Sequence, residues 1–417
     1  MTDSDTLTLS GTVKGGNKIL ASTNMVKFYG QSRDQMARLL ETVEEGATTI
    51  KVDSTLDWAV GDELFIASST VQHDYGEFRK ITAVDAGVVT LDKALWNYHY
   101  GAAESTGPLY NGVDVRTEVL MLTRNIKVYG EDADGWGGQI MATDLMEGDG
   151  TMREGYLIMD NVQVYNCSQK DTFKSAIRFD GAYGSSNTSS SITNCAVHNG
   201  LDWGLSILGS RNIKVHNSHF VGWRAVGVRI DTATNITFTD NFVGDVRRRV
   251  LNVLGMFIDK EACIAYGSYE SEKSGTVTRD MTFTGNTAAG CPFAGIIGPG
   301  DDCDDVDPVA FKNNIAHSVD GYGIYAYANP ASTTASNCFS FGYATAYKTV
   351  QASIFAMPST KLLKAHHLTA LDSQKGISLN TGGDERDDVE IILSDSFFFG
   401  ETAANDCPSI EEGKCVC

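Results

Sequence analysis

Between residues 190 and 340 the chain repeats one short unit, in which an apolar strand is closed by an Asn and followed by a Gly-rich turn. Intervals of 23, 24 and 23 residues separate several of the marker Asn residues, and the intervals of 45 and 28 residues fit a coil with an inserted loop and a coil with a lengthened turn. The marker residues are Asn194, Asn217, Asn241, Asn286, Asn314 and Asn337. Such a period constrains the fold strongly, because each unit must bury its apolar side against its neighbours.

A second marker, a Gly that opens the next strand, follows the same period. It occurs at Gly204, Gly227, Gly255, Gly295 and Gly323. No helical pattern lies between the strands, and units of 20–50 residues built from strands and turns are typical of solenoids. We therefore predict an all-β chain whose residues 131–400 form a right-handed parallel β-helix, with one coil per repeat and coils stacked at about the 4.8 Å strand spacing.

Alternation along the strands predicts which side chains face the core. In GVRID, Val228 and Ile230 point inward while Arg229 and Asp231 point outward; in GLSIL, Leu205 and Ile207 face the core. Stacked Asn amides on successive coils can hydrogen-bond along the helix axis. The alternative for the marker Asn is that it only tolerates the backbone angles of a turn.

The first third of the chain lacks the period. Apolar runs such as TTIKVD and RKITAVDAGVVTL are divided by Gly and Asp turns, which favours an antiparallel β-rich domain at residues 1–130 that caps the open end of the solenoid. Residues 34–45, DQMARLLETVEE, fit a short helix, and residues 401–417 fit a Cys-rich tail or linker.

Charge limits the partners of the chain. The formal net charge of −20 repels nucleic acid and anionic lipid, and no run approaches the roughly 20 apolar residues of a membrane helix. The opening segment lacks the pattern of a signal peptide. We expect no nucleic acid partner, no membrane insertion in this segment, and no cofactor apart from calcium at the acidic clusters 301–307 and 382–388.

The cysteines and sequons indicate an extracellular or cell-surface protein. None of the nine Cys residues has the CxxC spacing of a zinc site, and we predict no other metal. Cys291 and Cys303 flank the acidic cluster 301–307 and are predicted to form a disulfide. Glycosylation sequons begin at Asn166, Asn187 and Asn235.

Several segments resemble a known family. WAVGDELFIAS, VVTLDKALWNYHYG and RTEVLMLTRNIKVYGE are similar to the eight-glycine domain of fibrocystin and fibrocystin-like proteins, and of the cell-surface hyaluronidases related to them. SAIRFDGAYG, ITNCAVHNG and FKNNIAHSVDGYGIYAY resemble the β-helix that follows this domain. The resemblance covers roughly residues 15–345 and implies either a large ectodomain without known catalysis or a hyaluronan-cleaving enzyme.

The residues at the branch point favour the non-catalytic group. Where the resemblance implies a His-Phe-His in the hyaluronidases, this chain has Arg178, Phe179 and Asp180, so two groups able to transfer protons near neutral pH are replaced. Other polar positions tied by the resemblance to activity fall near His99, Arg124, Asp132 and Asp134. Each of these also has a structural interpretation, such as satisfying a turn or pairing with a carboxylate.

Outward polar residues supply the candidate ligand-binding surface. Arg178 and Asp180 share one outward face, and Arg229 and Asp231 share another two coils on; on one sheet they would form a strip suited to sugar hydroxyls and uronates. The alternative is an ordinary solvated face. Aromatic residues are candidate platforms for sugar stacking or plugs at the coil corners. They are Trp203, Trp223, Tyr322, Tyr325 and Tyr327.

The sequence thus predicts an extracellular structural or adhesive β-solenoid module that associates with itself, with other surface or matrix proteins, or with polysaccharide. Two alternatives are a polysaccharide-degrading, hyaluronidase-like enzyme and a glycan-binding module without turnover. An enzyme needs an acid/base pair within reach of one point in a groove, whereas the other two need none.

Overall fold

The computed structural model describes residues 18–103, 109–131, 136–170, 172, 174–184, 188–248, 261–267, 278–303, 311–327, 338–357, 362–379 and 390–404. Within these ranges every regular element is a strand, so the predicted all-β class is confirmed. No helix in them is long and apolar enough to cross a membrane. The short helix predicted at residues 34–45 is wrong, because Met36–Arg38 pairs as strand β3.

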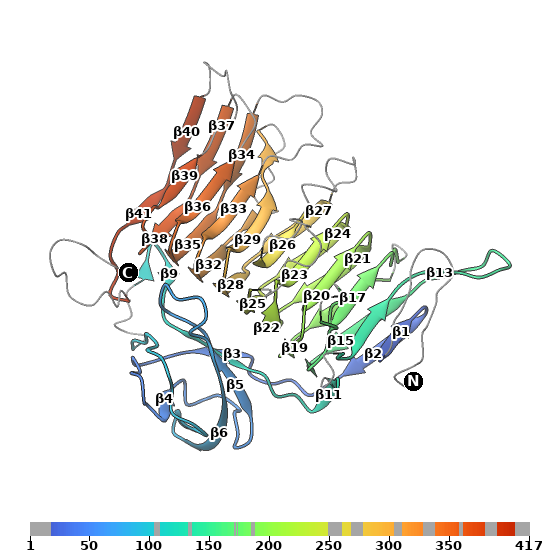
Figure 1. The fold of residues 1–417 in the computed structure, drawn as a ribbon, viewed down its shortest axis with the longest axis horizontal. Coiled ribbons are helices and arrows are strands. Elements are labelled where there is room, and N and C mark those ends of the chain that lie inside the picture. Colours follow the sequence, from blue (N-terminus) through green and yellow to red (C-terminus); the bar gives the residue numbers. More distant parts are fainter. Residues whose placement is uncertain are drawn as a thin grey trace.

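Three stacks of parallel strands form the predicted β-helix (Figure 1). Sheet 1 contains β1 (Ile19–Ser22), β12 (Gln139–Ala142), β17 (Ile177–Asp180), β20 (Leu205–Leu208), β23 (Val226–Asp231), β26 (Ala262–Tyr266), β29 (Ala294–Pro299), β33 (Tyr322–Tyr327), β36 (Ala352–Met357) and β39 (Ile377–Leu379). Sheet 2 contains β2 (Met25–Tyr29), β15 (Tyr156–Asp160), β18 (Ser190–Thr193), β21 (Arg211–His216), β24 (Thr234–Thr239), β27 (Arg279–Thr284) and β31 (Phe311–Lys312). Sheet 3 contains β11 (Ile126–Tyr129), β16 (Val162–Tyr165), β19 (Ala196–His198), β22 (His219–Arg224), β25 (Phe242–Arg247), β28 (Thr287–Cys291), β32 (Asn314–Val319), β35 (Ala344–Thr349), β38 (Thr369–Leu371) and β41 (Phe397–Phe399).

In its last coils the chain replaces sheet 2 by a separate stack of parallel strands. This stack contains β34 (Cys338–Gly342), β37 (Leu362–His366) and β40 (Glu390–Ser394), with β30 (Asp301–Asp302) antiparallel beside β34. Two small hairpins lie outside the large sheets, β8 (Leu109–Tyr110) with β9 (Val113–Asp114) and β13 (Leu145–Met146) with β14 (Met152–Arg153). The first packs against the last coils of sheet 3.

The predicted alternation is confirmed where the repeat is clearest. Leu205 pairs with Val228 and Ile207 pairs with Ile230, and all four side chains are fully buried in the solenoid core. Arg229 lies between them on the opposite face, in register with Ser206 of the coil before. The side-chain period of two therefore places one aliphatic row inside and one polar row outside.

The marker Asn residues that the structure describes occupy two neighbouring rows at the corner between sheets 2 and 3, and Asn337 lies outside the described residues. Asn194 and Asn217 have positive φ angles, and the Asn217 amide donates to Oδ1 of Asn194 at 2.8 Å. One position further along, Asn241 donates to Oδ1 of Asn286 at 3.1 Å, and Asn286 donates to that of Asn314 at 3.0 Å. The interval between Asn217 and Asn241 is 24 residues rather than 23, because the marker Asn moves there from the first row to the second. Both interpretations of the Asn therefore hold: the first row supplies turn geometry and amide bonds, and the second continues the amide ladder.

The marker Gly residues form one row. In one coil of this row, the residue present is not the Gly that the sequence period predicts. Gly204 lies against the Trp223 ring, and a Cβ there would meet Gly227 O at 2.5 Å. The next residue in this row is Cys263, because Val228 pairs with Ile264; Gly255, predicted for this place, lies outside the described residues. In that coil a cysteine side chain, rather than the hydrogen of a glycine, faces the interior.

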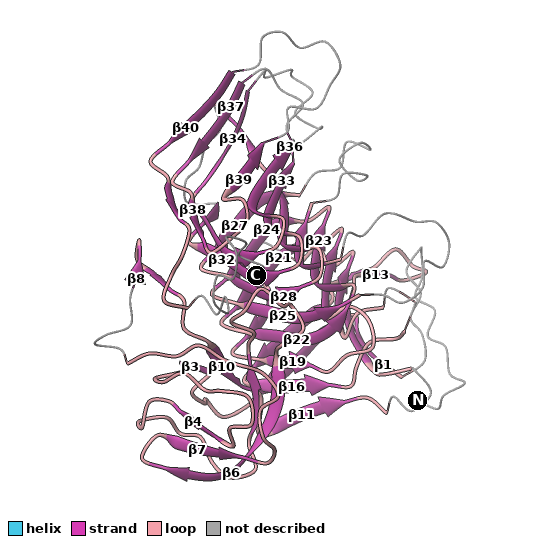
Figure 2. Cartoon of the chain, turned by 60° about the vertical axis from the view of Figure 1, so that its left-hand side comes forward, coloured by secondary structure: helices cyan, strands magenta, loops and turns pink. Residues whose placement is uncertain are grey.

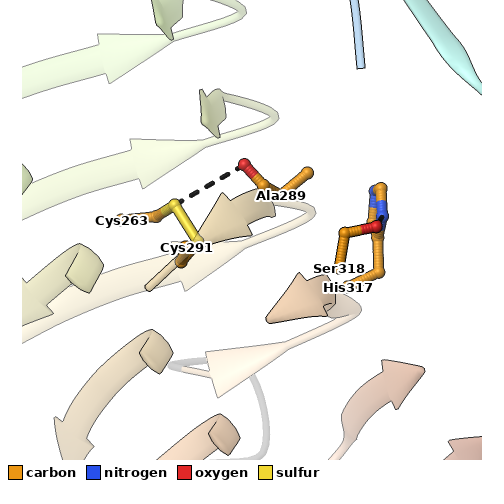
Figure 3. Close-up of a disulfide and its surroundings, with 5 residues drawn as sticks. All are labelled: Cys263, Ala289, Cys291, His317 and Ser318. Atoms are coloured by element: carbon orange, nitrogen blue, oxygen red, sulfur yellow. Dashed lines mark hydrogen bonds between the residues drawn. A yellow bond between two sulfur atoms is a disulfide. The ribbon is translucent and has the colours of Figure 1, made fainter. Parts of the chain in front are cut away.

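The predicted Cys291–Cys303 disulfide is wrong. Cys263 bonds to Cys291 across the coil, and Cys303 bonds to Cys338. Figure 3 shows the Cys263–Cys291 bridge on the core side of β28. This bridge joins a strand of sheet 1 to a strand of sheet 3. The prediction paired two cysteines that are close in sequence. In a solenoid, a core residue instead meets side chains on the other strands of its coil, which are further away in sequence.

The N-terminal domain is inserted rather than terminal, which corrects the predicted boundary at residue 130. β1 pairs with β12 and β2 pairs with β15, both parallel, so residues 19–29 already belong to the first coil. The chain then leaves the solenoid and returns at β11. The excursion forms an antiparallel sheet in the order β3-β10-β5-β6-β7-β4, with β10 (Glu118–Met121), β5 (Glu63–Ile66), β6 (Glu77–Asp85), β7 (Val88–Leu91) and β4 (Thr49–Lys51).

This inserted domain lies along the outer face of sheet 3 instead of capping an end of the solenoid (Figures 1 and 2). Apolar side chains from both bodies meet there in a buried cluster. The inserted domain contributes Phe65, Ala67, Leu120 and Leu122, and sheet 3 contributes Ala196, Val221, Phe242 and Ala289. Sheet 3 is thus buried on both faces along much of its length.

Candidate functional site

His99, the first catalytic candidate, is buried inside the inserted domain with no exposed surface. Its Nδ1 lies 2.9 Å from the carbonyl oxygen of Ala67, and its Nε2 lies 3.2 Å from Oε1 of Glu77. Glu77 is ion-paired with Arg79 and accepts backbone N–H groups near Trp96. Burial opposes ionisation of Glu77, but these hydrogen bonds and charges lower its pKa. Each polar atom of His99 therefore has a structural partner.

Arg124, the second candidate, fastens the inserted domain to the solenoid. It is 1% exposed and donates to the carbonyl oxygens of Met121 (2.9 Å) and Asn194 (3.1 Å), and to the side chain of Gln35. Burial lowers its pKa to about 10. It shares no hydrogen-bond partner with His99, so the structure does not bring the two together as an acid/base pair. Asp132 and Asp134 lie outside the described residues.

Two buried histidines that the sequence did not single out lie in the same interface. The Nε2 atom of His198 lies 2.9 Å from the Gln163 amide, and Nε2 of His219 lies 3.0 Å from the carbonyl oxygen of Gln35. Burial, reinforced by the positive charge of Arg124, lowers the pKa of each to about 3. These imidazoles are neutral at physiological pH and cannot act as general acids there.

A second polar contact joins the two bodies further along sheet 3. Glu118 of β10 lies 2.8 Å from the Arg38 guanidinium and 3.4 Å from Nε2 of His317. Burial opposes ionisation of Glu118, but the charges of Arg38 and His317 outweigh it and lower its pKa to about 2. The His317 ring stacks on Tyr347 with centroids 4.7 Å apart, on the side of the sheet opposite the disulfide (Figure 3). This cluster is an ion-pair network that fixes the docking.

The predicted strip on sheet 1 exists, but its charges are paired within each strand. Arg178 and Arg229 lie two coils apart in one outward row, with Ser206 between them. Arg178 is ion-paired with Asp180, and Arg229 lies 3.2 Å from Asp231. Arg229 is almost wholly buried. The ligand-binding role of the strip remains a prediction, and its local charge is neutralised.

The aromatic candidates are mostly packed. Trp223 is fully buried at a corner of the coil, and Trp203 and Tyr325 are nearly so. Tyr322 is partly buried in the same outer cluster as Trp203, so these rings mainly plug the fold. Of Tyr327 the structure describes the backbone only.

The remaining candidates differ in how much the structure describes. Asn235 is exposed on β24 and Asn166 is partly exposed, whereas Asn187 lies outside the described residues. Most of the acidic clusters 301–307 and 382–388 also lies outside them. Within the described part of the chain, no group of three or more His, Cys, Asp or Glu residues could hold a metal ion. Calcium binding therefore stays a prediction.

One polar pocket, missed by sequence reasoning, opens at the corner between sheets 3 and 1. Its volume is about 260 Å³. It is lined by Asn166, Asn199, Gly200, Leu201, Gly222, Trp223, Arg224 and Arg247. The lining residues come from consecutive coils and have no common motif in the sequence. Only the register of the strands, which pairs Arg224 with Arg247, could have brought them together.

Comparisons with known proteins agree with this architecture. The family described as "Right handed beta helix region" matches residues 152–297. Fibrocystin-L of Homo sapiens is 24% identical over 235 residues, covering 52% of this chain and 5% of that protein. Fibrocystin-L of Mus musculus is 35% identical over 107 residues, covering 25% of this chain and 2% of that protein. A G8 domain-containing protein of Dictyostelium discoideum is 27% identical over 131 residues, covering 30% of this chain and 11% of that protein.

The chain therefore spans a small fraction of the length of these curated relatives. Among solved structures, the tailspike protein gp49 from Pseudomonas phage LKA1 aligns over 93% of this chain and 65% of its own, with 12% identity and a TM-score of 0.23. A superposition at this level identifies neither a function nor a ligand.

Proposed function

Because the chain belongs to the fibrocystin-like proteins with a parallel β-helix region, we propose that it is a rigid, non-catalytic module of an extracellular or cell-surface protein. Two disulfides support an oxidising compartment. Stacked coils with continuous strand ladders support a mechanical role, since each coil pairs with the coils before and after it through three parallel sheets.

The observation that carries the proposal is the burial of the candidate catalytic groups. His99 and Arg124 are at most 1% exposed and are fully used in holding the inserted domain. Arg178, which would have to act beside them, lies on a different sheet and pairs with Asp180. An acid/base pair facing one substrate position is the minimum that hydrolysis requires. His99 and Arg124 stabilise the architecture instead.

Incubation of the purified chain with hyaluronan and other uronate polymers, followed by sizing of the products, tests this proposal. We expect no shortening of any polymer. Cleavage that disappears in Arg178→Ala would overturn the proposal, because that side chain is partly exposed and its loss leaves the buried interface intact.

Self-association is a second part of the proposal. Within the described residues, β39, β40 and β41 of the last coil each have one neighbouring strand, and so do β1, β2 and β11 of the first coil. Strand edges of this kind favour pairing with another chain. Sedimentation velocity over a range of concentrations should detect oligomers; a purely monomeric chain at high concentration would refute end-to-end pairing.

A non-catalytic glycan-binding module is the alternative function, and the polar corner pocket favours it. Binding without product in the polymer assay would select this alternative. The two proposals are compatible, since a rigid rod can also display a binding site.

A further inference from the structure

The corner pocket carries one positive charge, that of Arg224, which no carboxylate among the described residues neutralises. Arg224 is partly exposed, and its side chain has no ion-pair or hydrogen-bond partner among the residues that the structure describes. Arg247 lies directly above it on the next coil, at about the 4.8 Å strand spacing. Nη2 of Arg247 lies 3.3 Å from Oδ2 of Asp245, and the Arg247 side chain is 64% exposed.

Arg224 differs from the other outward arginines of the solenoid. Arg178 and Arg229 each pair with an Asp two residues along the same strand. Arg247 pairs with Asp245, two residues before it on β25, and the residue of β22 in register with Asp245 is Gly222, so Arg224 lacks a carboxylate at that position. The local excess of positive charge stands in a chain whose net charge is −20, which repels anions elsewhere.

The remaining polar lining consists of hydrogen-bonding groups without partners. The side-chain amides of Asn166 and Asn199 make no hydrogen bond within the described ranges. The buried indole N–H of Trp223, which also lines the pocket, likewise has no acceptor there. A buried polar group without a partner costs free energy, so the pocket is built to receive acceptor atoms from outside.

Gly222 keeps the pocket open. Its φ of +80° is one that L side chains rarely adopt, and a Cβ there would lie 3.1 Å from both Oδ1 of Asn199 and the Phe78 ring. Phe78 belongs to the inserted domain, so this wall of the pocket depends on the docking of the two bodies.

From these contacts we propose that the pocket binds one sugar-sized oxyanion, a carboxylate or sulfate carried on a single ring. Guanidinium groups bind the oxygens of carboxylates and sulfates through charge-assisted hydrogen bonds, and the amide groups suit neighbouring hydroxyls. The volume of about 260 Å³ lies just below the roughly 300–1,000 Å³ of sites for drug-sized ligands, which limits the occupant to one ring. Asp245 and Asp202 lie beside the pocket without lining it.

Isothermal titration of the full chain with glucuronate, glucose 6-sulfate and glucose tests this site. We expect saturable binding of at least one anion and at least tenfold weaker binding of neutral glucose. Arg224→Ala should weaken anion binding at least tenfold, because a hydrogen bond to a charged group is lost. Arg224→Lys should retain part of the affinity.

Arg153→Ala is the matched control, since it removes a partly exposed arginine from the β13–β14 hairpin, outside the pocket lining, and should leave binding unchanged. Thermal unfolding of each variant checks that the fold is intact. Carboxylate binding alone or sulfate binding alone identifies the ligand class, and either supports the site. Equal binding of glucose, or anion binding that survives Arg224→Glu, overturns the proposal. These outcomes do not depend on polymer cleavage, so the non-catalytic function stands or falls separately.

Discussion

Acid should loosen the attachment of the inserted domain through two buried histidines. His198 and His219 are neutral in the folded protein because burial and the nearby charge of Arg124 lower each pKa to about 3, from a usual value of 6.5. Unfolding releases them to water, where they regain their usual pKa. Between pH 6.5 and 3 the unfolded chain therefore binds more protons, and the free energy of unfolding falls as the pH is lowered.

The magnitude follows from the two pKa values. At pH 4.5 each unfolded imidazole lies two pH units below its pKa of 6.5 while the folded one stays neutral, which costs about 1.36 kcal/mol per unit, or about 2.7 kcal/mol for each histidine. Together they remove about 5 kcal/mol relative to pH 7.5. Asp245 opposes this loss, because burial raises its pKa to about 6 and its protonation stabilises the folded state.

Urea unfolding of the wild type and of the double variant His198→Gln/His219→Gln at pH 7.5 and 4.5 measures the effect. The variant loses stability at both values, but the drop between them should be smaller than in the wild type by about 5 kcal/mol. Contributions of Asp245 cancel in this difference. Gln163→Met is the control: it removes a hydrogen-bond partner of His198 without removing an ionisable group, and should keep the wild-type drop. Equal drops in the wild type and the double variant would refute the assigned burial.

Three further outcomes are expected. Affinity for glucuronate should rise as the pH falls through about 6, because protonated Asp245 releases Arg247, and Asp245→Asn should show the higher affinity already at pH 7.5; titrations across pH would reject this if both proteins showed the same profile. Replacing Cys263 and Cys291 by Ala should lower the free energy of unfolding by about 3–4 kcal/mol, as expected for a loop of 28 residues, whereas a peptide map showing Cys291 bound to another Cys would contradict the observed pairing. Arg124→Met should cost roughly 3–5 kcal/mol, because two carbonyl oxygens lose hydrogen bonds from a charged donor at about 1.5–3 kcal/mol each, and should expose residues 30–125 to limited proteolysis. Protease resistance equal to wild type would show that the guanidinium is not what fastens the domain.

The repeating part of the fold could be predicted from sequence because one physical requirement recurs in every coil. An aliphatic pair such as Val228 and Ile230 must face the core, and an Asn must adopt a turn angle and bond to its neighbour. The 24-residue interval between Asn217 and Asn241 records a shift between two adjacent rows, which becomes visible only when strand register is known. The period shows that coils stack, and register shows which side chains meet.

The insertion could not be predicted from periodicity, because residues 19–29 comprise only short strands whose partners lie more than 100 residues away. A signal was nevertheless present in sheet 3. Phe242 and Val243 are adjacent, and both are buried, one against the inserted domain and one in the solenoid core. Consecutive apolar residues in a strand indicate burial on both faces, whereas a solvated sheet alternates. The sequence signal that sheet 3 is covered on its outer face therefore lies in the strands of the solenoid, and not in the inserted domain.

Polar residues misled the functional interpretation because they hold the inserted domain on sheet 3. A domain docked on a sheet must bury the backbone groups at its strand ends, and long donors such as Arg124 meet that need by bonding several carbonyl oxygens at once. Placing such a cation there then depresses the pKa of the neighbouring His198 and His219 further, so the histidines most sheltered from solvent are also the least able to carry a proton. Chemistry directed at a ligand is better sought where a charge lacks a partner. On this solenoid that condition is met at Arg224, because Gly222 stands in register with Asp245, the acidic residue that pairs with Arg247 on the next coil.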